Sequence, residues 1–374
     1  MKIVNIVGAR PNFMKIAPLM RAYKQYNDSI NPVLVHTGQH YDETMSKTFF
    51  EQLDIPRPDI NLGVGSGSHA EQTAKIMMSF EKLIKDEKPD IVLVVGDVNS
   101  TMACTITAAK FGIKTVHVEA GLRSFDMTMP EEINRKVTDS ICDYLFTTEE
   151  SANKNLRNEG VKEERIFFVG NVMIDTLAYY LDKIKDMPLP FRGLTQNNST
   201  DIDGIVEKNY ATLTMHRPSN VDDRSVLEGI FFTLEKIQKD IPIVFPMHPR
   251  TRKNIDHFGL SGKVSGMRNL IITEPIGYFE FLRLNKTAKF ILTDSGGLQE
   301  ETTYLRIPCL TLRENTERPV TIDVGTNVLV GSDPDTILDE YGKIMNGNFK
   351  KGRTPFLWDG HAAERIVEQL AELA

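Results

Sequence analysis

The chain has 374 residues, and this length predicts two domains, because a single hydrophobic core stops growing at smaller sizes. Hydrophobic residues make up 41% and charged residues 25% of the sequence, as in ordinary globular proteins and not in disordered or fibrous chains. The formal net charge of −7 argues against sequence-independent binding of nucleic acid, which requires a basic face.

The first half of the chain alternates short β-branched runs with helical patterns. This alternation predicts parallel strands joined by crossover helices. The predicted strands are 3–7, 32–37, 91–97, 115–121, 144–148 and 166–170. Together they predict an N-terminal Rossmann-like α/β domain over residues 1–185.

The same alternation restarts after a polar, irregular stretch at 186–208. The predicted strands there are 210–216, 241–249, 270–275, 290–296, 308–312 and 327–331. We expect a second doubly wound domain over 186–356, and a helix in 357–374 that packs against the first domain. Ligands of such sheets bind at the carboxyl ends of the strands, so these turns and the interdomain cleft are the predicted active site.

The sequence carries no leader, membrane or metal pattern. MKIVNIVG runs directly into the polar turn ARPN, and no apolar run approaches the about 20 residues of a membrane span. Cys104, Cys142 and Cys309 lie far apart, without metal-ligand spacing, and are expected to be buried thiols. We therefore expect a cytoplasmic protein without a metal or a membrane partner.

The segment LTDSGGLQEET, residues 292–302, predicts a diphosphate site. A strand ends at Ser295-Gly296-Gly297 and a helix follows, so backbone N–H groups and the helix N-terminus face an anion. An ordinary turn capped by Ser295 is the alternative. Glu300 and Glu301 follow in the first turns, where a carboxylate accepts hydrogen bonds from ribose hydroxyls, which favours a nucleotide over free phosphate.

Basic residues follow other predicted strands. GARPNFMK at 8–15 is not GxGxxG, which argues against a dinucleotide fold, but its Arg10 and Lys15 suit a leaving diphosphate. Surface solvation is the alternative for both. Two histidine turns follow later strands, and His216 is the first candidate among them. Their cationic and imidazole side chains are His216, Arg217, His248, Arg250 and Arg252.

Acidic residues gather in the first domain. Asp97 and Glu119 each end a predicted strand, where partial desolvation suits a carboxylate to proton transfer near neutrality. Glu131 and Glu132 open the helix that begins with MPEEINR. The alternative is helix capping or pairing with Arg123 or Arg135, and Glu132 is the expected structural member.

These acids and the diphosphate site together predict removal of a C–H proton while a nucleotide leaves. His36, His40 and His69 do not combine with Cys or Asp at ligand spacing, and Ser295 has no evident His-Asp partners. Metal-dependent and serine hydrolase chemistry are therefore disfavoured.

Eight motifs, taken together and in order, resemble the non-hydrolysing UDP-N-acetylglucosamine 2-epimerases, from Gly8 to the C-terminal helix. They are GARPNFMK, GDVNST, HVEAGLRS, MPEEINR, TMHR, TDSGGLQEE, and LRENTERP followed by GTNVLVG. The resemblance implies two Rossmann-like domains arranged as in GT-B glycosyltransferases, with UDP held mainly by the second. It also implies a homodimer and no cofactor.

The family chemistry implied by this resemblance is anti elimination of UDP to a 2-acetamidoglucal and re-addition with the opposite configuration at C2. The resemblance also implies that the product is a precursor of cell-surface polysaccharide. The implied catalytic residues are Asp97, Glu119, Glu131 and His216. The implied UDP-binding residues are Arg10, Lys15, His216, Phe281, Ser295, Gly296, Gly297, Glu301 and Arg313, with Glu301 on the ribose and Phe281 beside the uracil.

The chain departs from many bacterial members at their regulatory site. Pro218 and Ser219 stand where those members have Arg and Glu, and Asp42 stands three positions after Gln39 where they have a second Gln. We therefore predict weak or absent activation by a second UDP-N-acetylglucosamine.

Other functions stay open at this point. They are 2-epimerisation of a related sugar such as UDP-diacetamido-glucuronic acid, a hydrolysing 2-epimerase, a GT-B glycosyltransferase, and a catalytically silent nucleotide-sugar-binding protein. Three carboxylates favour epimerisation, because an inverting transferase needs only one general base.

Overall fold

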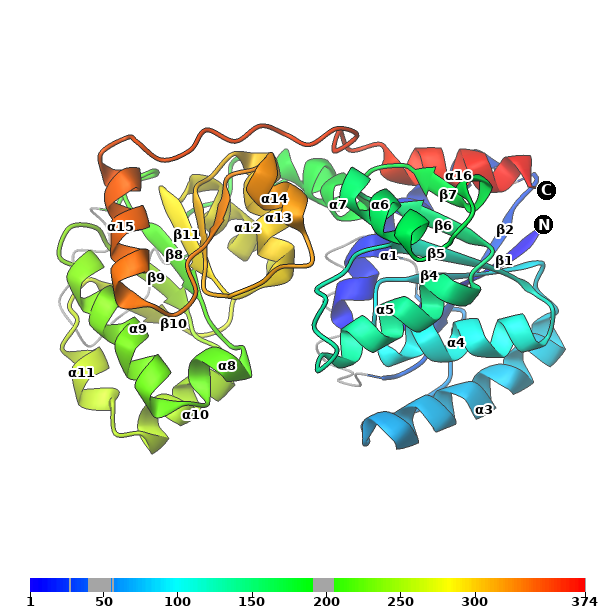
Figure 1. Ribbon diagram of the computed structural model, residues 1–374, viewed down its shortest axis with the longest axis horizontal. Coiled ribbons are helices and arrows are strands. Elements are labelled where there is room, and N and C mark those ends of the chain that lie inside the picture. The colour runs from blue at the N-terminus through cyan, green and yellow to red at the C-terminus, as the bar shows by residue number, and fades with distance from the viewer. Residues whose placement is uncertain (27, 40–54, 56, 191–204, 374) are drawn as a thin grey trace. The chain divides into compact units, whose positions relative to one another are not determined.

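The computed structural model describes residues 1–374 except 27, 40–54, 56, 191–204 and 374, and leaves the side chain of Arg10 undescribed. The chain divides into two compact units (Figure 1). Unit 1 comprises Met1–Tyr179 and Phe356–Ala374, and unit 2 comprises Tyr180–Pro355. The predicted division after residue 185 lies slightly further along the chain.

Unit 1 is built on a seven-stranded parallel sheet with the order β3-β2-β1-β4-β5-β6-β7. Its strands are β1 (Lys2–Val7), β2 (Asn31–His36), β3 (Ile60–Asn61), β4 (Ile91–Val95), β5 (Lys114–Ala120), β6 (Tyr144–Thr147) and β7 (Ile166–Phe168). Its α-helices are α1 (Arg10–Ala22), α3 (His69–Glu87), α4 (Asn99–Lys110), α5 (Pro130–Ile141), α6 (Glu150–Asn158), α7 (Val172–Leu181) and α16 (Ala362–Glu372). Short 3-10 helices lie at Tyr23–Tyr26 and Glu163–Arg165.

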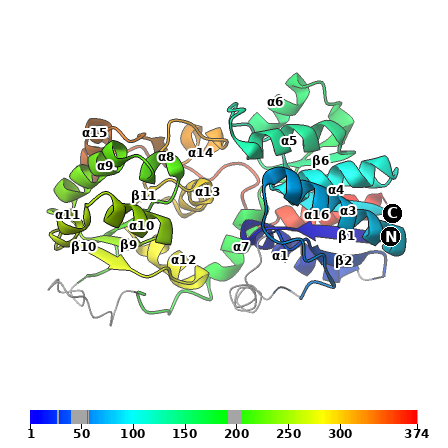
Figure 2. The same ribbon diagram turned by 90° about the horizontal axis from the view of Figure 1, so that it is seen from below.

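Helices cover both faces of this sheet (Figures 1 and 2). Helix α3 packs on α4, α4 packs on α5, and α1 packs on α16, the helix that returns from the end of the chain. The carboxylate of Asp175 in α7 accepts the N–H groups of Ala362 at 3.1 Å and Ala363 at 2.6 Å, and so caps α16. The C-terminal helix therefore packs within unit 1, as the sequence predicts.

Unit 2 repeats the design with a six-stranded parallel sheet of order β10-β9-β8-β11-β12-β13. Its strands are β8 (Ala211–Thr214), β9 (Ile243–Pro246), β10 (Leu270–Thr273), β11 (Phe290–Thr293), β12 (Cys309–Thr311) and β13 (Asn327–Leu329). Its helices are α8 (Pro218–Val221), α9 (Arg224–Ile237), α10 (Pro249–His257), α11 (Ser261–Ser265), α12 (Tyr278–Thr287), α13 (Gly296–Leu305), α14 (Pro319–Asp323) and α15 (Pro334–Met345).

Alternating side chains of the unit 2 strands bury both faces of the sheet. Leu213, Phe245 and Leu292 belong to one hydrophobic cluster, which includes residues of α9 and α15. Val244 and Ile291 belong to a second cluster, which includes residues of α12. A sheet buried on both faces explains why its strands read as near-continuous apolar runs.

The fold class predicted from the sequence, two doubly wound Rossmann-like domains, is confirmed. Every predicted strand is present within a few residues, and the sequence missed only the two-residue strand β3 among the described strands. Cys104, Cys142 and Cys309 are buried free thiols, as predicted. No helix among the described residues combines the length and apolarity needed to cross a membrane. In each sheet the order reverses at the centre, beside β1 and β4 in unit 1 and beside β8 and β11 in unit 2.

Candidate active site

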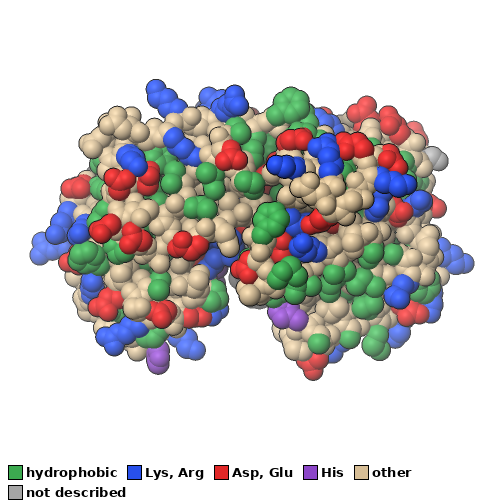
Figure 3. All heavy atoms as spheres, in the orientation of Figure 1, with side chains coloured by type: hydrophobic (Ala, Val, Ile, Leu, Met, Phe, Trp, Pro, Cys, Tyr) green, Lys and Arg blue, Asp and Glu red, His purple; other side chains and the backbone are tan. Residues whose placement is uncertain are grey.

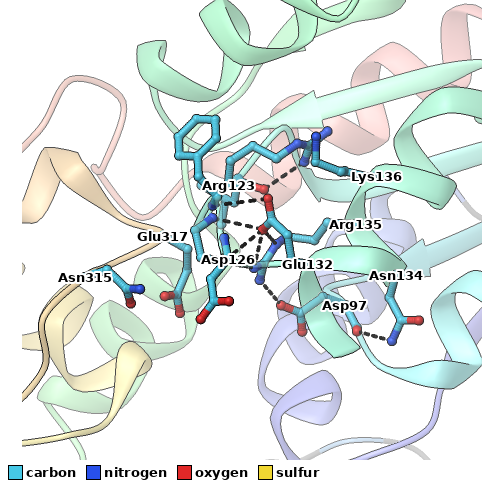
Figure 4. A network of polar contacts seen from close by, with 12 residues as sticks. Asp97, Arg123, Asp126, Glu132, Asn134, Arg135, Lys136, Asn315 and Glu317 are labelled. Atoms are coloured by element: carbon cyan, nitrogen blue, oxygen red, sulfur yellow. Dashed lines mark hydrogen bonds and ion pairs between the residues drawn. The ribbon is translucent and has the colours of Figure 1, made fainter. Parts of the chain in front are cut away.

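Asp97 follows β4, at the point where the strand order of unit 1 reverses and ligands of such folds bind. Its Oδ2 lies 2.6 Å from Nη1 of Arg135 in α5 (Figure 4). The side-chain amide of Asn134 donates to the Asp97 carbonyl oxygen at 2.8 Å. The Asp97 side chain is 27% exposed, so it is oriented by α5 and remains reachable by a ligand.

Glu119 lies at a distortion near the end of β5. The register with β6 shifts between Val118 and Ala120, and Glu119 has a φ of 75°, which is rare for a residue with a side chain. Bulges of this kind redirect a side chain, and backbone strain of this kind gathers at functional sites. The Glu119 carboxylate is 3% exposed and forms an ion pair with Lys15 of α1.

Lys15 reaches Glu119 across the glycine that precedes Asp97. A Cβ atom on Gly96 would lie 2.7 Å from the Lys15 Nζ, and Gly96 has a φ of +68°. Only glycine combines this backbone conformation with room for the ammonium group. Lys15, predicted from the sequence to serve the diphosphate, therefore has a buried carboxylate of unit 1 as its observed partner.

The paired acids of α5 have different surroundings. Glu131 is exposed in the first turn of the helix. Glu132 is buried, accepts the Ser124 N–H at 2.9 Å and pairs with Arg135 at 2.7 Å. Burial alone would raise the pKa of Glu132, but the Ser124 N–H and Arg135 outweigh it and hold this pKa below its usual value. The predicted structural role of Glu132 is confirmed, and Figure 4 shows Arg135 shared between Glu132 and Asp97.

The start of α13 in unit 2 is the predicted anion cradle. Ser295 is the N-cap residue, but its side chain makes no capping hydrogen bond, so the alternative of an ordinary serine cap is wrong. Ser295, Gly296 and Gly297 are each partly exposed. The first N–H groups of a helix have no partner within it, so this end of α13 can donate to phosphate oxygens.

Gly296 is packed tightly and Gly297 is not. A Cβ atom on Gly296 would lie 2.7 Å from Oε1 of Glu317, whereas a Cβ atom on Gly297 would meet nothing within 4 Å. Glu317 pairs with Arg318 and, at 2.9 Å, with Arg313. These two cations overcome the effect of burial and hold the pKa of Glu317 well below its usual range. The cradle is thus bordered by guanidinium groups that Glu317 fixes in place.

Arg313 retains a donor for a ligand. Its Nη1 is buried and has no hydrogen-bond partner among the described residues. A buried guanidinium nitrogen without an acceptor is costly, and a ligand oxygen would relieve that cost. This geometry supports the predicted contact of Arg313 with UDP.

His216 is oriented by an aspartate that the sequence analysis left unassigned. Its Nδ1 lies 3.0 Å from Oδ1 of Asp294, which directly follows β11. Burial would raise the pKa of Asp294, but the hydrogen bond from His216 and the N–H groups of Arg217 and His216 keep this pKa below its usual value. An ionised carboxylate only accepts hydrogen bonds, so Nδ1 carries a proton and Nε2 is the nitrogen left for a ligand. Nε2 donates to an anion when the ring is an imidazolium, which Asp294 stabilises. Asp294 lies between the end of β11 and Ser295, the N-cap of α13, and this position in the sequence could have indicated its role.

The second predicted histidine turn is committed to local contacts. His248 caps α10 by accepting the Arg250 N–H at 3.1 Å, and its ring lies 5.6 Å from that of His216. Burial, with the nearby His216 and Arg250, lowers the pKa of His248. Arg250 pairs with Asp222 and Arg252 pairs with Glu274, so both arginines lie in surface ion pairs.

Glu301 and its neighbours form the remainder of the unit 2 site. Glu300 pairs with Arg318 at 2.8 Å, whereas Oε2 of Glu301 is buried without a hydrogen-bond partner in the described part of the chain. Burial and the Glu300 charge raise the pKa of Glu301 to about 8. The hydroxyl of Tyr278 is likewise buried without such a partner. Half-buried Phe281, also on α12, packs against a hydrophobic cluster.

Some predicted positions lie outside the described residues. Asp42 and His40 fall in the undescribed segment 40–54, and the side chain of Arg10 at the start of α1 is also undescribed. Gln39 is described, and its Oε1 accepts the Ser100 hydroxyl at 2.7 Å. Among the described side chains, no group of three or more His, Cys, Asp or Glu residues is placed to hold a metal ion.

Comparison with known proteins identifies the family. A family model described as UDP-N-acetylglucosamine 2-epimerase matches residues 22–371. The chain is 44% identical to the UDP-N-acetylglucosamine 2-epimerase of Methanocaldococcus jannaschii, covering 99% of both chains. It is 39% identical to the UDP-2,3-diacetamido-2,3-dideoxy-D-glucuronate 2-epimerase of Pseudomonas aeruginosa, covering 100% of both.

A solved structure agrees with these matches. The structure of the Methanocaldococcus jannaschii UDP-GlcNAc 2-epimerase in complex with UDP-GlcNAc and UDP is similar with a TM-score of 0.86 and 43% identity, over 100% of both chains. The resemblance inferred from the motifs is therefore confirmed. The chain belongs to the UDP-N-acetylglucosamine 2-epimerase family.

Proposed function

We propose that the chain catalyses reversible C2 epimerisation of UDP-N-acetylglucosamine to UDP-N-acetylmannosamine, a precursor of cell-surface polysaccharide. One observation carries this proposal. Carboxylates end the central strands of unit 1, whereas a helix N-terminus and an oriented imidazole end the central strands of unit 2. The first set suits proton transfer, and the second suits a diphosphate.

Unit 2 supplies the binding of UDP in this proposal. The N–H groups at Gly296 and Gly297, the His216 Nε2 and the Arg313 Nη1 bind the diphosphate, joined by Arg10 of unit 1. Glu301 accepts the ribose hydroxyls, and Phe281 lies beside the uracil. These contacts stabilise the charge that develops on the departing UDP.

Unit 1 supplies the proton transfers. A carboxylate of the set Asp97, Glu119 and Glu131 takes the C2 proton, and the C2–H electron pair forms the C1–C2 double bond. The C1–O bond breaks, and UDP leaves with its electron pair. UDP then adds back at C1, and a proton reaches the opposite face of C2. Atoms and charge balance without a redox cofactor.

A related sugar is the second candidate substrate. The 39% identity with the diacetamido-glucuronate epimerase covers the whole of both chains, so the same scaffold serves a sugar with an acetamido group in place of the C3 hydroxyl and a carboxylate in place of the hydroxymethyl group on C5. The elimination chemistry would be unchanged, because it involves only C1 and C2.

We also propose that the chain forms a homodimer through the outer face of α3, α4 and α5. Met78 is 66%, Phe111 45% and Ile133 43% exposed on or beside these helices. A groove of about 490 Å³ next to them is lined by Met77 and Met102, among others. Figure 3 shows hydrophobic side chains gathered over this region, and exposed apolar patches of this kind mark association surfaces.

The dimer is tested by light scattering of the wild type and of Met78→Lys. We expect a dimer in the first and a smaller mass in the second, because a buried charge opposes association. Lys154→Met, an exposed substitution on α6, is the control and should leave the mass unchanged. A monomeric wild type would contradict the proposal.

The function is tested by proton NMR with UDP-N-acetylglucosamine in deuterated water. We expect deuterium at C2 and a second UDP-sugar with its own anomeric signal. Free UDP with N-acetylmannosamine would show a hydrolysing enzyme. If exchange is absent for this sugar but present for UDP-2,3-diacetamido-glucuronate, the second candidate is correct.

A further inference from the structure

A buried histidine in β5 touches the backbone that carries two of the proposed catalytic carboxylates. The Nδ1 of His117 lies 2.6 Å from Oδ1 of Asp139 in α5, and its Nε2 lies 2.8 Å from the carbonyl oxygen of Gly96. The two side chains are 0% and 1% exposed. Neither residue has a role in the mechanism described above.

The hydrogen-bond partners define the protonation of His117. The Gly96 carbonyl only accepts hydrogen bonds. Burial would raise the pKa of Asp139, but His117 and Arg123 outweigh it and hold this pKa below its usual value, so Asp139 is ionised and also only accepts. A neutral imidazole has one N–H and satisfies one acceptor, whereas an imidazolium satisfies both. The two short contacts therefore describe a buried imidazolium.

The charge of this imidazolium is balanced within the buried network. Asp139 also pairs with Arg123 at 2.7 Å, and Arg123 forms a two-pronged ion pair with Glu159. His117 and Arg123 thus face the carboxylates of Asp139 and Glu159. Glu159 is 31% exposed and also pairs with Lys136 at 3.4 Å. Each buried charge of the network therefore has a counter-charge. The Cys142 thiol also lies near Asp139. Burial raises the pKa of this thiol, so the thiol is neutral.

The network binds the backbone on both sides of the proposed chemistry. Gly96, whose carbonyl accepts from His117, directly precedes Asp97. The Gly121 N–H, two residues after Glu119, donates to Oδ2 of Asp139 at 3.0 Å. Gly96, Glu119 and Gly121 all have positive φ angles, and such conformations persist only where the surroundings enforce them.

We propose that His117, held by Asp139, is a positioning residue that fixes the turns presenting Asp97 and Glu119 for proton transfer. The inference rests on the proposed epimerase function, because it assigns the chemistry to those two carboxylates. Proton transfer from carbon requires the base within a narrow range of distance and angle. A displacement of about 1 Å caused by a change away from the chemistry can cost about 10²-fold in rate.

The substitution that tests this proposal is His117→Asn, whose amide replaces Nδ1 and can still donate to Asp139, but whose side chain is too short to reach Gly96. We expect kcat to fall by about 10²-fold. KM and the dissociation constant of UDP should stay within about twofold, since the proposed UDP contacts lie mainly in unit 2. His117→Gln, whose amide replaces Nε2 and donates to Gly96, should recover part of the lost kcat.

Tyr23→Phe is the matched control. The Tyr23 hydroxyl donates to Asn5 at 3.0 Å inside unit 1, so this change also removes a buried hydrogen bond, but away from the acid-bearing turns. We expect a lower Tm with an unchanged kcat. If His117→Asn lowers Tm as Tyr23→Phe does and leaves kcat unchanged, His117 is merely structural and the proposal is overturned.

A second measurement needs no variant. Nitrogen-15 NMR of histidine-labelled wild type, at the pH of the activity assay, should show one buried ring with both nitrogens protonated, as the two acceptors facing His117 require. A neutral ring at His117 would overturn the proposal even if the variants fail to fold. If the proposed epimerase function itself is wrong, the wild type will show no deuterium exchange at C2, and this result is distinct from the outcomes for His117.

Discussion

Unit 1 and unit 2 have the same strand order around their centres but place opposite chemistry there. In unit 1 the carboxylates at the strand ends are paired with cations, Glu119 with Lys15 and Asp97 with Arg135. In unit 2 the strand ends present helix N–H groups and His216, and Glu301 has a buried oxygen that lacks a hydrogen-bond partner among the described residues. The shared topology places the site, and the turn residues decide its chemistry.

The largest effect is expected from the carboxylates of unit 1. Asp97→Asn or Glu119→Gln should lower kcat by about 10²-fold or more, because each removes an acid–base group. UDP should bind both variants as it binds the wild type, as measured by calorimetry. Glu150→Gln, which changes an exposed acid of α6, is the control for loss of charge. Full turnover in both Asp97→Asn and Glu119→Gln would contradict the proposal that unit 1 supplies the proton transfers.

A substitution in unit 2 is expected to lower turnover less than the unit 1 substitutions do, and also to weaken the binding of UDP. His216→Ala removes a donor to the diphosphate, and hydrogen bonds to charged groups contribute about 1.5–3 kcal/mol. UDP affinity should therefore fall about 10- to 100-fold, and turnover should fall with it. His257→Ala, on the exposed part of α10, should change neither. Unchanged UDP affinity in His216→Ala would separate His216 from the diphosphate.

Substitutions of the two cradle glycines, Gly296 and Gly297, are expected to affect the stability of the protein differently. Gly296→Ala places a methyl group against Glu317 and should lower the free energy of unfolding by about 1–3 kcal/mol. Gly297→Ala points into open space and should leave stability unchanged or slightly higher. Chemical denaturation of both variants measures the difference. Equal stability would contradict the tight packing of Glu317 against α13.

Glu301 predicts a pH dependence of UDP binding. With a pKa of about 8 in the free protein, this carboxyl is mostly protonated at pH 7 and mostly ionised at pH 9. The ionised form accepts two ribose hydroxyls, so the affinity for UDP should rise by up to about tenfold over this range. Glu301→Gln should abolish the rise, and a rise that persists in this variant would assign it to another group.

The same carboxyl affects stability with the opposite trend. The folded-state pKa lies above the usual value of 4.5, so the folded protein retains this proton over a pH range in which the unfolded chain has lost it. The contribution of Glu301 to the free energy of unfolding is therefore fully present below about pH 4.5 and is lost as the pH rises towards about 8. Thermal unfolding of the wild type and of Glu301→Gln across this range measures the difference.

The sequence predicted the strands and the residues that end them, because buried parallel strands are long apolar runs and their turns are polar. It missed β3, since two residues give no periodic signal. It did not predict the partners of those residues. Lys15 and Glu119, or His117 and Asp139, are far apart in the chain, and only the folded arrangement brings them together. Asp294 was missed because its role depends on the backbone of a neighbouring strand end.

The central claim is that UDP leaves and returns during epimerisation, and the most direct test uses UDP-N-acetylglucosamine with oxygen-18 between C1 and the β-phosphorus. When C1–O breaks, the labelled oxygen becomes one of three terminal oxygens of the UDP β-phosphate. The account predicts that phosphorus NMR finds the label in non-bridging positions of recovered UDP-sugar, at a rate comparable with epimerisation. Formation of UDP-N-acetylmannosamine with the label wholly in the bridge would contradict it.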